Sequence, residues 1–64
     1  MSQQESRNES TFTVNQFCEY HNISRSMFYK LLQQGQGPRL MAVGRRRLIS
    51  NEAAADWRQQ MEKP

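Results

Sequence analysis

The sequence predicts a mainly α-helical domain with one small two-stranded β-hairpin. Three segments place their apolar residues on a single helical face, and each follows a Ser or Thr that can cap a helix N-terminus. Before the third segment, a Gly-Arg pair separates two short runs suited to β-strands. A chain of 64 residues forms one domain at most. We expect this domain at residues 11–62, after a disordered N-terminal tail at residues 1–10.

The first helix is expected to begin at Val14. Thr13 and Gln16 have the spacing of a capping box, in which each side chain accepts a hydrogen bond from the other residue's backbone N–H. Asn22 readily takes the left-handed conformation that ends a helix. One arc of this helix holds Val14, Phe17, Cys18 and His21. We interpret the arc as core, with Cys18 and His21 as packed residues rather than a nucleophile and a metal ligand.

The second helix is expected from about Arg25 to Gln34, after the N-cap Ser24 and before the C-cap Gly35. Its apolar half consists of Met27, Phe28, Leu31 and Leu32. The opposite half carries only cationic or hydrogen-bonding side chains, namely Arg25, Ser26, Tyr29, Lys30 and Gln33. A helix divided in this way buries one half and leaves the other for solvent or a ligand.

The expected hairpin strands are Leu40–Val43 and Arg46–Ile49, with the Gly44-Arg45 pair as a type II′ turn between them. In this register, Met41 opposes Leu48 and Val43 opposes Arg46. Three arginines, Arg45, Arg46 and Arg47, then cluster at the tip of the hairpin.

The third helix is expected at Asn51–Glu62, with Ser50 as its N-cap. Its apolar stripe consists of Ala53, Ala54, Trp57 and Met61. We expect Trp57 to be the largest contributor to the core, because an aromatic ring of this size buries the most surface. Met27 and Met41 are interpreted as core residues as well.

The middle of the chain is strongly basic. Residues 23–50 carry a net charge of +6 without any acidic residue, whereas residues 1–22 carry −2 and residues 51–64 carry −1. A concentrated cationic zone is typical of a surface that binds a polyanion. The sequence has one cysteine and no Cys/His cluster, cofactor motif or membrane-length apolar run. We expect a cytoplasmic, nucleoid-associated protein without metal, cofactor or membrane contact.

The first two helices, joined by three or four residues, have the layout of a helix-turn-helix, whose second helix enters the major groove of DNA. Arg25 and Ser26 lie in the first turn of that helix, where this motif meets base edges. We expect Arg25 to bind a guanine, which an arginine can contact through two acceptors. Beside them, Tyr29 shares the face of Arg25, Lys30 is expected at a phosphate, and Gln33 at an adenine or a phosphate.

The hairpin completes a winged helix-turn-helix. Its arginines, Arg45, Arg46 and Arg47, are expected to contact the DNA backbone or an adjacent minor groove, where arginine suits the enhanced negative potential. Ser24 and Arg39 are further candidates for phosphate contacts. The partner predicted by the layout is double-stranded DNA.

Four pieces of sequence occur in a specific order: TVNQFCEYHNISRSMFYKLL, GQGP, VGRRRLIS and EAAADW. With these pieces, residues 11–58 resemble the small MerR-like winged helix-turn-helix proteins, which include phage and mobile-element excisionases and AlpA-type regulators. Similar proteins often have alanine at the position of Cys18, glycine at Asn22 and a larger aliphatic residue at Ala54. The last departure implies a thinner core.

The resemblance implies an excisionase-like recombination directionality factor of a phage or mobile element. Such a factor binds beside a recombination site, often in several copies, assists an integrase or recombinase, and can also regulate transcription. A domain of this size covers only a few base pairs, so useful specificity requires repeated sites, a partner protein or self-association on adjacent sites.

Three other functions remain open. The chain can be an AlpA-type transcriptional regulator without a recombination role. It can also be a protein-interaction module whose helices dock a partner without DNA, or a DNA-docking subunit of a larger complex. An enzyme is the least supported, because the sequence has no paired carboxylates, Gly-rich phosphate loop or nucleophile-base pattern.

Overall fold

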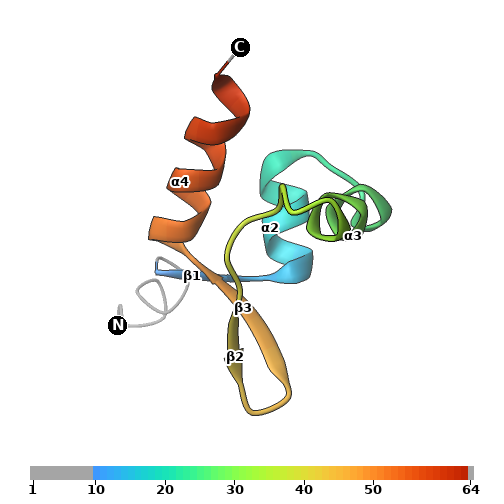
Figure 1. Cartoon of the computed structure of the whole chain (residues 1–64). Helices are drawn as coiled ribbons and strands as arrows, with labels where there is room; N and C mark the ends of the chain where they lie inside the picture. The colour runs from blue at the N-terminus through green and yellow to red at the C-terminus, as the bar shows by residue number, and fades with distance from the viewer. Residues whose placement is uncertain (1–9, 64) are drawn as a thin grey trace.

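The computed structural model describes residues 10–63. In chain order the elements are β1 (Thr11–Thr13), α2 (Val14–His21), α3 (Arg25–Gln33), β2 (Met41–Val43), β3 (Arg46–Ser50) and α4 (Asn51–Glu62). Figure 1 shows α2 and α3 together on one flank, the β2–β3 hairpin projecting away from the helices, and α4 rising on the other side. The predicted fold class, a winged helix-turn-helix with three helices and a hairpin, is confirmed.

The expected N-terminal tail lies outside the described residues except for Ser10. The carbonyl oxygen of Ser10 accepts a hydrogen bond from the backbone N–H of Asn51 at 2.9 Å. Ser10 is therefore joined to the first turn of α4, next to the sheet. Within residues 10–63, no helix has the length and hydropathy needed to cross a membrane.

The caps that start and end the helices follow the sequence closely. Thr13 and Gln16 form the predicted capping box, with N···O distances of 3.0 Å and 3.1 Å. Asn22 ends α2 in the left-handed conformation at φ 58°. In α3 the last helical residue is Gln33, one residue before the predicted end, because Gln34 is the C-cap and Gly35 follows at φ 75°.

The sheet has a third strand that sequence analysis did not predict. Its strand order is β1-β3-β2, and both outer strands run antiparallel to β3. On β1, Phe12 pairs with Ile49 and Thr13 pairs with Leu48. Three residues are too few to show strand periodicity, and β1 is formed by pairing with a segment far along the chain. The wing is thus anchored to the start of α2.

The β2–β3 hairpin has the predicted register, with Met41 opposite Leu48 and Val43 opposite Arg46. Gly44 has a φ of 61°, whereas Arg45 is not among the positive-φ residues. A type II′ turn requires positive φ only at its first central residue, so this backbone agrees with the predicted turn. The turn places all three wing arginines at or next to the tip.

The core lies where the three helices meet the sheet. Its fully buried large side chains come from different elements: Phe17 from α2, Phe28 from α3 and Ile49 from β3. Cys18, Ala53, Ala54 and Trp57 complete the buried cluster. Phe17 is central, since the centroid of its ring lies 5.6 Å from the ring centroid of Phe28 and 5.1 Å from that of Trp57.

The placement of three methionines in the core is wrong. Met27, Met41 and Met61 are between 38% and 44% exposed. Met41 pairs with Leu48 and not with Ile49, so it leaves the sheet on the face away from the core. Met61 lies in the last turn of α4, beyond the segment whose Ala53, Ala54 and Trp57 are buried.

Trp57 packs in the core and also holds the loop that follows α3. The residue is only 7% exposed, as predicted for a major core residue. Its indole Nε1–H donates a hydrogen bond to the carbonyl oxygen of Gln36 at 3.0 Å. The same residue therefore joins α4 to both the core and the α3–β2 loop.

Replacing Trp57 by alanine should abolish cooperative unfolding at 25 °C. Truncating a buried tryptophan costs about 3–5 kcal/mol, and the whole core of so small a domain contributes only a few kcal/mol. The control is Trp57→Phe, which keeps an aromatic ring but removes the hydrogen bond to Gln36, and which should cost less than the alanine variant. Urea denaturation followed by circular dichroism measures both. A Trp57→Ala variant that unfolds like the wild type would show that the core does not depend on this ring.

Candidate nucleic-acid interface

The helix α3 presents one polar surface to solvent. Ser24 caps the helix, with its Oγ accepting a hydrogen bond from the N–H of Met27 at 3.0 Å. Phe28 anchors the opposite side in the core, with Leu31 and Leu32 partly buried beside it. All five predicted contact residues of the helix are exposed, namely Arg25, Ser26, Tyr29, Lys30 and Gln33. None of the nine residues of α3 is acidic.

A three-residue turn joins α2 to α3 and sets their relative direction. Asn22 takes the left-handed conformation, and its N–H donates to carbonyl oxygens of the last turn of α2. The N–H of Ile23 donates to the carbonyl oxygen of Cys18 at 3.0 Å, and its side chain packs against the core. Ser24 then caps α3 directly. The two helices therefore have the connection expected for a helix-turn-helix.

The three wing arginines differ in the direction in which they leave the hairpin. Successive side chains of a strand point to opposite faces of the sheet. Arg47 shares its face with Ile49, which is buried in the core cluster that also contains Phe28 of α3. Arg46 shares its face with Leu48. Arg45 lies in the tip of the hairpin, outside both strands.

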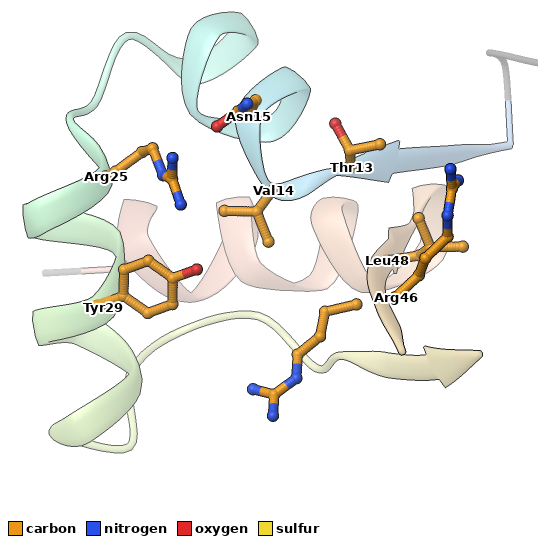
Figure 2. A pocket seen from close by; sticks show the side chains of 8 residues that line it. Thr13, Val14, Asn15, Arg25, Tyr29, Arg46 and Leu48 are labelled. Carbon is orange, nitrogen blue, oxygen red and sulfur yellow. The ribbon is translucent and has the colours of Figure 1, made fainter. Parts of the chain in front are cut away.

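A groove of about 320 Å³ lies between α3 and the wing. Figure 2 shows Arg25 and Tyr29 on α3 at one side of this groove, Arg46 and Leu48 on β3 at the other, and Val14 between them. The residues that line it are Thr13, Val14, Asn15, Arg25, Tyr29, Arg46, Arg47 and Leu48. Two of the predicted helix residues and two of the predicted wing residues are thus brought together. Ser26, Lys30, Gln33 and Arg45 are exposed but do not line the groove.

Among the described residues that line it, the groove has three guanidinium groups and no carboxylate. Arg25, Arg46 and Arg47 all line it, and none of them forms an ion pair with another described residue. Three cations on the walls of one concave surface raise the local concentration of anions. The groove is therefore suited to a polyanion and unsuited to a cation.

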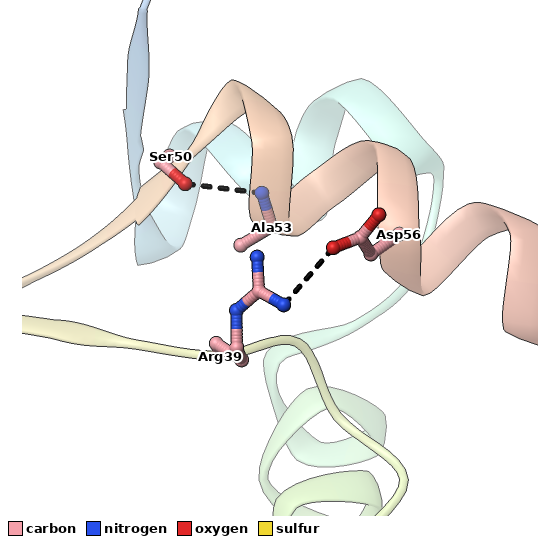
Figure 3. A network of polar contacts seen from close by, with 4 residues as sticks. All are labelled: Arg39, Ser50, Ala53 and Asp56. Atoms are coloured by element: carbon pink, nitrogen blue, oxygen red, sulfur yellow. Dashed lines mark hydrogen bonds and ion pairs between the residues drawn. The ribbon is translucent and has the colours of Figure 1, made fainter.

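Arg39 lies elsewhere and has an acidic partner. Its Nη1 is 2.9 Å from Oδ2 of Asp56 on α4, and both side chains are exposed. Figure 3 shows this ion pair beside the first turns of α4, where Ser50 caps the helix through the N–H of Ala53. Arg39 is thus partly neutralised in the free protein, unlike the three arginines of the groove. An exposed pair of this kind adds little stability.

Cys18 and His21 are packed residues, as the sequence suggested. Burial raises the pKa of the Cys18 thiol, and the nearby charge of Arg25 lowers it by less. The thiolate, which is the reactive form, is therefore disfavoured. His21 is held at both ring nitrogens, with Nδ1 2.8 Å from the carbonyl oxygen of Phe17 and Nε2 3.0 Å from Nη1 of Arg58.

The hydrogen bonds of His21 identify its tautomer. Arginine only donates, so Nε2 accepts from Arg58 and Nδ1–H donates to the carbonyl oxygen of Phe17. The residue joins α2 to α4 inside an aromatic cluster. Over residues 10–63 there is no group of three His, Cys, Asp or Glu side chains that could hold a metal ion.

Sequence reasoning missed two polar residues of the groove, Thr13 and Asn15. Thr13 was identified only as a helix cap, and Asn15 was not among the candidate residues. Both reach the groove because β1 pairs with β3 and so brings the start of α2 next to the wing. A prediction that residues 11–13 pair with β3 would have placed Thr13 and Asn15 beside the wing.

A comparison with protein families finds a match to this chain. The helix-turn-helix domain family matches residues 11–61, which run from β1 to the last turn of α4. The comparison with curated proteins found no match to the chain. The matched range includes α2, α3, the turn between them and the whole wing, so the chain belongs to the helix-turn-helix domain family, a family of DNA-binding domains.

Proposed function

We propose that the chain binds specific sites on double-stranded DNA through α3 and the wing together. The observation that carries this proposal is the groove that Arg25 and Tyr29 of α3 line together with Arg46 and Arg47 of β3, with no carboxylate among its described lining residues. A single duplex can engage both surfaces. Among residues 10–63 the three arginines of this groove have no acidic partner, which favours a polyanion such as DNA as their ligand.

The dimensions of α3 suit the major groove. Nine helical residues give a length of about 14 Å, and a helix with its side chains is roughly 10–12 Å across against a groove width of about 12 Å. Arg25 and Ser26 in the first turn are proposed to meet base edges, while Lys30 and Gln33 contact a phosphate or a base further along. The wing arginines supply sequence-independent affinity from the backbone or the minor groove.

We further propose the biological role of an excisionase-like recombination directionality factor, which assists an integrase and can also act on transcription. The resemblance of residues 11–58 to excisionases supports this role. One copy spans only a few base pairs, so several copies on adjacent sites, or an integrase bound beside the chain, would supply the missing specificity.

Removing two wing charges should weaken binding to every duplex and flatten its salt dependence. Each neutralised phosphate contributes about 0.9 to the log–log salt slope, so Arg45→Ala with Arg46→Ala should reduce the slope by roughly 1.8. The matched control is Arg45→Lys with Arg46→Lys, which retains both charges and should retain the slope. Fluorescence anisotropy titrations at salt concentrations from about 50 to 200 mM measure the slope. An unchanged slope in the alanine variant would refute the wing assignment.

Replacing Arg25 by alanine should alter the preference among DNA sites more than the general affinity. A bidentate contact to guanine is worth about 1–3 kcal/mol of discrimination, whereas loss of one charge affects all sequences alike. Arg25→Lys is the control for charge, because lysine keeps the cation but loses the planar fork that matches two acceptors. Selection from a random-sequence duplex pool measures preference. If both variants select the wild-type sites, Arg25 does not read a base.

The recombination role predicts where the protein binds in its source genome. Mapping of bound sites should find them clustered beside an integrase attachment site, and deletion of the gene should reduce excision while integration continues. Binding confined to promoters, with excision unaffected by deletion, would instead assign the AlpA-type regulatory role. Loss of DNA occupancy in the Arg45→Ala, Arg46→Ala variant is the control that links the mapped sites to the wing.

A further inference from the structure

Tyr29 and Arg47 place one donor group each in the groove between α3 and the wing. Tyr29 is 42% exposed, and its ring makes an edge-to-face contact with that of Phe28, with the ring centroids 5.2 Å apart. Among residues 10–63, neither the hydroxyl of Tyr29 nor the guanidinium of Arg47 has a hydrogen-bond or ion-pair partner. Both line the same groove, from opposite sides.

The position of Arg47 follows from the strand register. Arg47 lies two residues before Ile49 on β3, so both side chains leave the same face of the sheet. Ile49 packs in the core that also contains Phe28 of α3. Arg47 therefore leaves β3 toward the flank occupied by α3, where Tyr29 follows Phe28 directly. Arg45 at the hairpin tip does not line the groove and does not share this geometry.

The ligand that fits this pair is an anion with several acceptor oxygens. A tyrosine hydroxyl and an arginine fork both donate hydrogen bonds to phosphate oxygens, and arginine can donate two at once. The remaining polar lining, Thr13 and Asn15, is neutral, and Arg25 and Arg46 add positive charge. Nothing in this lining repels a phosphate.

We propose that Tyr29 and Arg47 bind the same phosphate group of one DNA strand, which runs through the groove between α3 and the wing. This inference rests on the proposed function, since the phosphate belongs to the DNA that α3 and the wing engage. The shared phosphate couples the two DNA-contacting elements and sets the register of α3 along the major groove. Arg45, in contrast, contacts the backbone independently.

A double-mutant cycle tests whether the two residues share one phosphate. The DNA is a duplex selected by the full chain from a random-sequence pool. Tyr29→Phe removes only the hydroxyl and should weaken binding about ten-fold, the effect of one hydrogen bond to a charged group. Arg47→Ala should weaken it at least as much. If the residues share a phosphate, the double variant should lose far less than the product of the two single losses.

The matched control cycle pairs Tyr29→Phe with Arg45→Ala, which removes the same type of charge outside the groove. There the two losses should multiply. If the affinity losses of the single variants multiply in both cycles, or if Tyr29→Phe does not weaken binding, the inference is overturned. DNA binding by α3 and the wing would then still stand. Failure of the proposed function looks different, because then the wild-type chain would show no salt-dependent duplex binding. Circular dichroism melting of each variant confirms that these exposed substitutions leave the fold unchanged.

A chemical change in the DNA identifies the phosphate itself. In a set of duplexes, one backbone linkage at a time is replaced by a neutral methylphosphonate. One linkage should weaken wild-type binding, and the same linkage should have little further effect on either Tyr29→Phe or Arg47→Ala. Sensitivity of the two variants to two different linkages would contradict a shared phosphate.

Discussion

The packing of Phe28 and Ile49 into one core determines what this domain can do. Phe28 belongs to α3 and Ile49 belongs to β3, and both side chains are fully buried. Phe28 directly precedes Tyr29 in the sequence, and Ile49 lies on the same face of β3 as Arg47. Both Tyr29 and Arg47 line the groove. Because interiors pack as tightly as organic crystals, neither element can shift relative to this shared core without opening a cavity. The core thus holds the helix and the wing at a fixed spacing before any DNA is bound.

That rigidity matters because the domain is small. A short chain buries a modest fraction of its surface, so its stability margin is narrow. Phe17, His21 and Trp57 concentrate much of the stabilisation in one aromatic cluster, and the Trp57 hydrogen bond to Gln36 extends it to the loop before the wing. The arginines of the groove repel one another in the free protein, and this repulsion is relieved when a polyanion binds. DNA is therefore expected to stabilise the fold as well as to be its ligand.

Local signals in the sequence were sufficient for most of the fold. The caps at Thr13, Ser24 and Ser50, the left-handed Asn22 and the Gly44 turn are short-range features, and each formed as predicted. The strand β1 is different, because its pairing with β3 joins distant parts of the chain and leaves no periodic pattern in three residues.

The same distinction applies to the candidate site. The exposed half of α3 and the arginine-rich wing were visible in the sequence. The groove that joins them, with Thr13 and Asn15 as part of its lining, was not, because it depends on β1. The methionines were misplaced for a related reason. A helical wheel or a strand alternation identifies an apolar side chain but does not show where the core ends.

In the proposed binding mode, one duplex contacts α3 and the wing at the same time. An NMR titration of the ¹⁵N-labelled chain with a selected duplex tests this most directly. Amide signals of residues 25–33 and 44–47 should shift together along a single binding curve, while those of residues 58–62, at the far end of α4, stay in place. Shifts confined to one of the two surfaces, or centred on the end of α4, would contradict the account.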